Sequence, residues 1–93
     1  MKNQQFESVW DALENTPAEA ENMKLRSQLM MALQAHLSEK DLNQTAAAKL
    51  FGVTQPRVSD LMRGKIDLFG LDALVNMAVA AGLQITLQIG SAA

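Results

Sequence analysis

The sequence predicts an all-α domain followed by one short β-strand. Apolar residues recur at helical spacing in five separate segments, and capping residues or glycines bound most of these segments. Only the last segment alternates apolar and polar residues, as a half-buried strand does. A chain of 93 residues supports one modest hydrophobic core, so we expect a single domain with short extensions.

The first element is expected to be an amphipathic helix within residues 1–15, an extension ahead of the main domain. Phe6, Val9, Trp10 and Leu13 recur at i, i+3, i+4 and i+7, so they share one helical face. This face either completes the core or contacts another protein, and the sequence leaves both interpretations open.

The main domain is expected to cover residues 16–82 and to begin with a long helix. Thr16 is a typical N-cap, Pro17 suits the first turn, and Glu19 closes a capping box. We expect this helix to reach Glu39 or Lys40. Its predicted apolar stripe consists of Leu25, Leu29, Ala32, Leu33, His36 and Leu37, with Met23 and Met30 at the edge.

Two short helices follow, each with its own N-cap. Asn43 caps a helix predicted over Gln44–Phe51, which Gly52 ends, and Thr54 caps a helix from Gln55 to about Arg63. The inward residues of the second helix are predicted to be Val58, Leu61 and Met62. Its predicted outward residues are Pro56, Arg57, Ser59, Asp60 and Arg63.

A last helix is predicted over Leu71–Ala81, with Gly82 ending it. Its predicted apolar face consists of Leu71, Leu74, Val75, Ala78 and Val79.

The terminal segment 83–93 changes to the period of a strand. Its alternating apolar residues are Leu83, Ile85, Leu87 and Ile89. A lone strand leaves its backbone groups unpaired, so it needs an edge from elsewhere. We therefore expect these four side chains to form a dimer or partner interface, the alternative being packing on their own domain.

Charge is sorted along the chain, although the total is only −2. Residues 1–42 carry −3, residues 43–66 carry +3, and residues 67–93 carry −2. Attraction to phosphates depends on the local face, so the middle segment suits nucleic acid and the acidic first segment suits a basic partner.

Several function classes are not expected. The chain has no cysteine and one histidine, so no disulfide, metal or cofactor site is predicted, and no nucleophile and base pair indicates an enzyme. No apolar run approaches the ~20 residues of a membrane helix, and the first residues do not resemble a signal peptide. A cytoplasmic location is the resulting expectation.

The residues between 42 and 65 fit two helices that cross steeply through a tight turn. Ala48 is small where the helices approach, and Gly52 can adopt the positive φ of the turn. This segment resembles the lambda-repressor-like, XRE-type helix-turn-helix family. The matching positions are Gln44, Ala48, Gly52, Val58 and Leu61, followed by Arg63-Gly64-Lys65, whereas Ala46 stands where many members have glutamate. The resemblance implies a five-helix lambda-repressor-like domain that binds double-stranded DNA.

The resemblance also implies roles for individual residues. Gln55 and Arg57 correspond to base-reading positions, since glutamine pairs with adenine and arginine with guanine. Ser59 fits either base or phosphate contact, and Asp60 either accepts from cytosine or orients an arginine. The positions that usually hold the phosphate backbone are Asn43, Gln44, Thr54, Arg63 and Lys65.

A wider match resembles the HigA-type antitoxin branch of this family. It rests on the residues 9–13, the long helix with Leu25-Arg26-Ser27, and Asp67-Leu68-Phe69 through Gly82. It implies a homodimeric repressor of its own operon, bound at an inverted repeat, that also neutralises a basic toxin protein. Candidate toxin contacts are Phe6, Val9, Trp10 and Leu13. A stand-alone repressor, or a protein-binding inhibitor with a vestigial helix-turn-helix, are the alternatives.

Overall fold

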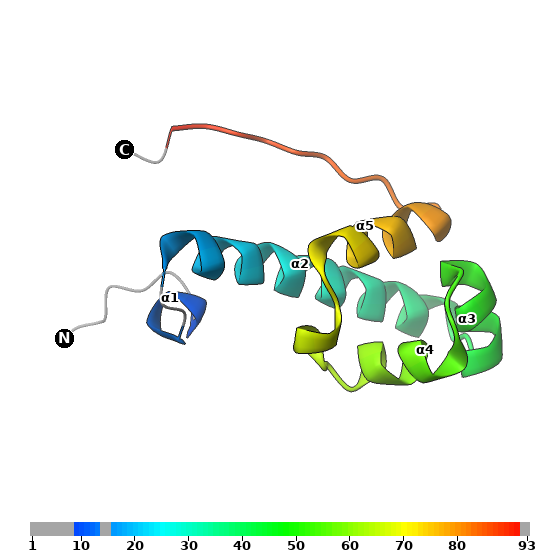
Figure 1. Cartoon of the computed structure of the whole chain (residues 1–93). Coiled ribbons are helices and arrows are strands. Elements are labelled where there is room, and N and C mark those ends of the chain that lie inside the picture. The colour runs from blue at the N-terminus through cyan, green and yellow to red at the C-terminus, as the bar shows by residue number, and fades with distance from the viewer. Residues whose placement is uncertain (1–8, 14–15, 92–93) are drawn as a thin grey trace.

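The computed structural model describes residues 9–13 and 16–91, and this part of the chain is helical without a strand. Phe6 lies outside the described residues. The elements labelled in Figure 1 are α1 (Val9–Leu13), α2 (Pro17–Lys40), α3 (Gln44–Phe51), α4 (Gln55–Met62), the 3-10 helix η1 (Ile66–Leu68) and α5 (Leu71–Ala80).

The long helix α2 is the axis of the fold. Figure 1 shows α3, α4 and α5 gathered along its C-terminal half and α1 beside its N-terminal part. The indole Nε1 of Trp10 donates to Ser27 Oγ at 2.9 Å, which ties α1 to α2. Val9 and Leu13 of α1 are 61% and 63% exposed, so these two side chains do not complete the core.

The predicted helix starts are confirmed by their caps. The side chains of Thr16, Asn43 and Thr54 accept from the backbone amides of Glu19, Ala46 and Arg57, at 3.0, 2.8 and 3.4 Å. Each bond satisfies an amide that the first helical turn leaves without an intrahelical acceptor.

The core lies between α2, α3, α4 and α5. It consists of Met30, Leu33, Leu37, Ala47, Ala48, Phe51, Val58, Leu61, Phe69, Leu74, Met77 and Ala78. The predicted stripe of α2 is partly wrong: Leu25 and Ala32 are exposed, whereas Met23 and Met30 are buried. The cause is that α2 is covered on more than one side, so its buried sector does not follow a single stripe. His36 is half-buried, and its Nε2 has no hydrogen-bond partner among the described residues.

Two further predicted inward residues are exposed. Val79 on α5 is 62% exposed and Met77 is buried in its place. Met62 at the end of α4 is 42% exposed. Both exposed residues lie in the last turn of their helix.

The predicted C-terminal strand is not formed in the described residues. Leu83 still packs against the core, and its amide donates to Ala78 O at 2.9 Å. Beyond it the chain runs away from α5 as an extended tail (Figure 1), with Leu87 and Ile89 74% and 83% exposed. The nearby helices α2 and α5 have their backbone groups paired internally, so they offer no edge on which the tail could form a strand.

Candidate nucleic-acid interface

A close crossing of α3 and α4 builds the site. Ala47 and Ala48 are 1% and 8% exposed, and their small side chains let the two helices approach. Gly52 caps α3 in the left-handed region, with φ +70° and ψ 34°, and its amide donates to Ala48 O. Since side chains disfavour this conformation, glycine allows the chain to turn directly from one helix into the next.

The inner side of α4 is held firmly. Val58 and Leu61 are 1% and 0% exposed in the core. On α2, the Gln34 side chain donates from Nε2 to Leu61 O at 2.8 Å, near the C-terminal end of α4. The apolar contacts and this bond together hold the axis of α4 against α2.

The N-terminal tip of α4 faces solvent. Thr54, Gln55 and Pro56 are exposed, opposite the buried Val58 and Leu61. Gln55 Nε2 donates to Thr45 Oγ1 at 3.1 Å, which links the first turns of α3 and α4. Thr45 is not among the predicted site residues, although its hydroxyl follows Gln44 in the exposed first turn of α3. Ser59, one turn after Gln55 on the same face, is half-buried.

Arg57 is oriented toward its own domain. Its Nη1 donates to Leu68 O at 2.7 Å, and its guanidinium carbon lies 4.0 Å from the centre of the Phe69 ring. Phe69 is fully buried, and Arg57 is half-buried. The predicted base-reading arginine is therefore in contact with the last residue of η1 and with the residue that follows it.

The predicted phosphate-binding residues lie at the start of α3 and at both ends of α4. Asn43 and Gln44 are exposed at the start of α3, Thr54 at the start of α4, and Arg63 and Lys65 after its end. Asn43 and Thr54 also serve as N-caps, so their side-chain oxygens are already used by backbone amides.

Asp60 forms an ion pair with Lys65, with Oδ1 and Nζ 3.8 Å apart. The sequence left open whether Asp60 accepts from cytosine or orients Arg57 or Arg63, and the structure pairs Asp60 with Lys65 and with neither arginine. Asp60 is half-buried and Lys65 is exposed, so the pair is in contact with water and weak. Lys65 therefore keeps its charge near the surface where a phosphate would approach.

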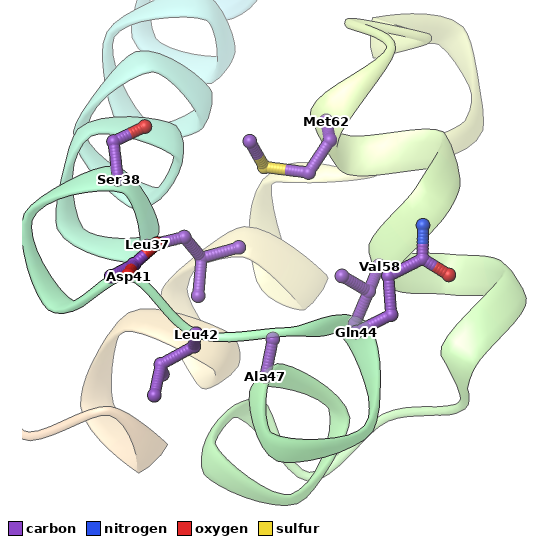
Figure 2. A pocket seen from close by; sticks show the side chains of 8 residues that line it. All are labelled: Leu37, Ser38, Asp41, Leu42, Gln44, Ala47, Val58 and Met62. Carbon is purple, nitrogen blue, oxygen red and sulfur yellow. The ribbon is translucent and has the colours of Figure 1, made fainter.

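A hollow of about 230 Å³ lies behind the motif, between the end of α2, the start of α3 and α4. Figure 2 shows Met62 extending across its rim from α4, opposite Ser38 and Leu37 of α2. The rest of its lining consists of Asp41, Leu42, Gln44, Ala47 and Val58. The partly exposed Met62 therefore still shields an apolar recess, which explains its position between core and solvent.

A metal-ligand cluster and a membrane-spanning helix are both missing from the described part of the chain. Its histidine, aspartate and glutamate residues form no cluster of three that could hold a metal ion. Within the same residues, none of the helices combines the length and the apolar character that a membrane span requires.

Comparisons with known proteins agree with this geometry. A family model described as a helix-turn-helix domain matches residues 12–90. A solved structure described as a candidate XRE-family transcriptional regulator is 30% identical in sequence with a TM-score of 0.72, and the match covers 77% of this chain and 81% of that chain. A search of curated proteins finds no match.

Proposed function

The chain belongs to the helix-turn-helix domain family and is of the XRE type, and from this premise we propose that it is a sequence-specific DNA-binding transcriptional repressor. The observation that carries the proposal is the orientation of α4. Its tip at Gln55 is exposed while Val58 and Leu61 fix the opposite side in the core. A short helix held in this way can place its N-terminal residues against base edges in the major groove.

Gln55 and Ser59 are the proposed reading residues. They lie four residues apart on one face of α4, so both can face the same groove. Phosphate contacts from Asn43, Gln44 and Thr54, and from Arg63 and Lys65 beyond the helix, are proposed to set the register. The local charge of +3 over residues 43–66 supports this assignment.

The regulator is proposed to act as a homodimer joined through its C-terminal tail. Leu87 and Ile89 are exposed, and the tail borders an apolar groove of about 390 Å³ against α2 and α5. Residues 73–93 contain no charged side chain, so two copies can approach here without repulsion. A two-fold axis would place two α4 tips in successive major grooves, about 34 Å apart, and the operator would be an inverted repeat.

Binding to DNA upstream of the chain's own gene tests the proposal. We expect a specific shift in a gel assay at ~100 mM salt, where non-specific binding is weak. The matched control is a scrambled duplex of the same length. Equal binding of both duplexes, or none, would contradict a sequence-specific regulator and would favour the inhibitor with a vestigial motif.

The finer role that we propose is that of an antitoxin. Supporting it, Val9 and Leu13 expose apolar surface on α1, and residues 1–42 carry a net charge of −3 that suits a basic protein. Co-expression with the product of the adjacent gene tests this role. We expect the product of the adjacent gene to inhibit growth when it is expressed alone and to co-purify with this chain. Val9→Asp should abolish the co-purification. If the product of the adjacent gene neither binds this chain nor inhibits growth, the result contradicts the antitoxin role and favours a stand-alone repressor.

A further inference from the structure

We propose that Arg57 is a positioning residue for the recognition helix α4 and not a base-reading residue. The proposal rests on the DNA-binding function proposed above and changes its specificity site. It assigns base readout to the face with Gln55 and Ser59, and it assigns to Arg57 the task of holding α4 at the angle at which that face meets a groove.

The side chain of Arg57 makes two different contacts with the same short segment. The guanidinium stacks on the Phe69 ring, 4.0 Å from its centre, and Nη1 donates to Leu68 O at 2.7 Å. A planar guanidinium suits both contacts at once, because its face lies on the ring while its edge donates a hydrogen bond. To reach a base, Arg57 would have to give up both contacts.

The segment that Arg57 contacts is itself fixed to α2. Phe69 is 0% exposed in the core, and its carbonyl oxygen accepts from Arg26 Nη1 at 3.0 Å. The contacts therefore run from α2 through Arg26 and Phe69 to Arg57 on α4. Gln34 forms a second link from α2 to α4 at Leu61, toward the other end of the helix.

These two links lie at different ends of an eight-residue helix. Gln34 acts near the C-terminal end, whereas Arg57 is in the N-terminal turn, two residues after Gln55. Loss of the Arg57 contacts would leave the tip held by the turn at Gly52, by Val58 and by the exposed hydrogen bond between Gln55 and Thr45. The position of Gln55 relative to a groove thus depends on Arg57, even though Arg57 need not touch a base.

The test compares variants of the full chain for operator affinity and for base preference, measured by selection from a randomised duplex pool at a temperature where each variant is folded. We expect Arg57→Ala to weaken operator binding about tenfold, because it loses a cation–π contact and a charged hydrogen bond, with no position of the operator changing its preferred base. Arg57→Lys should recover part of the affinity, since an ammonium can also lie over the ring. Lys49→Ala is the matched control, which removes the same charge at an exposed position of α3 that has no proposed role, and it should change operator binding much less than Arg57→Ala.

Phe69→Leu supplies a second, independent measurement. It removes the ring under Arg57 and leaves the hydrogen bond to Leu68 O as the remaining contact, so it should also weaken operator binding, and the double variant should lose little more than Arg57→Ala alone. Relaxed preference at one base pair in Arg57→Ala, with Phe69→Leu unaffected, would overturn the proposal in favour of base readout. Unchanged affinity of folded Arg57→Ala would overturn it as well. Selection by the parent protein tests the proposed function separately. If the parent selects no sequence, the result contradicts a sequence-specific regulator, whatever the role of Arg57.

Discussion

Replacing Gly52 by alanine tests the physical basis of the turn between α3 and α4. Gly52 has φ +70° and ψ 34°, in the left-handed region. A Cβ atom placed on Gly52 would meet no atom within 4 Å, so alanine causes no clash. The whole effect of Gly52→Ala is therefore backbone strain.

The size of this backbone strain sets the expected loss of stability in Gly52→Ala. A side chain in the left-handed region costs about 1–2 kcal/mol per residue. In a domain of this size, 1 kcal/mol lowers Tm by roughly 4–8 °C. We therefore expect Gly52→Ala to lower Tm by roughly 5–15 °C.

Thermal unfolding followed by circular dichroism measures the effect. Asparagine tolerates the left-handed region better than alanine, so Gly52→Asn should lose only part of the stability. Gly90→Ala is the matched control, because Gly90 lies in the exposed tail with nothing within 4 Å of an added Cβ. A Tm of Gly52→Ala equal to that of the parent, or equal losses for alanine and asparagine, would refute the reasoning.

Three further predictions concern the end of α2, the phosphate contacts and the dimer. Asp41 caps α2 with φ 52°, so Asp41→Gly relieves backbone strain. After the entropy cost of glycine, stability should rise by about 0.5 kcal/mol, and Tm by a few degrees in the same unfolding assay. A lower Tm would contradict the strain at Asp41. Lys65→Ala should weaken binding to operator and random duplexes alike and reduce the slope of log K against log salt by about 1 in fluorescence anisotropy; a loss confined to the operator would place Lys65 among the base-reading residues. Leu87 is 74% exposed, and Leu87→Asp should convert the dimer to a monomer in light scattering. Gln88→Asp is the control and should remain dimeric. A monomeric parent, or a dimeric Leu87→Asp variant, would contradict pairing through the tail.

The features predicted well from the sequence depend on neighbouring residues. Thr16, Asn43 and Thr54 cap their helices through amides only three positions away, and Gly52 turns the chain by its own backbone conformation. Such contacts are fixed by local chemistry, so the pattern of residues is enough to indicate them. The crossing that presents Gln55 was predictable for the same reason.

The features that the sequence could not predict depend on contacts between distant segments. Arg57 contacts Leu68 and Phe69 only because the chain after α4 folds back beneath it, and no spacing rule indicates that path. The buried side of α2 depends in the same way on which helices cover it. The alternation in the tail predicts a strand that the described residues do not form, because the pattern does not identify a partner edge for the tail.

The tip of α4 is proposed to read DNA sequence. Selection of duplexes from a random pool, by the parent chain and by Gln55→Ala, tests this role most directly. The parent should enrich an inverted repeat whose half-sites lie about 34 Å apart, and Gln55→Ala should keep that spacing but lose the preference at one base pair of each half-site. No enrichment by the parent, or the same base preferences with and without Gln55, would contradict the claim.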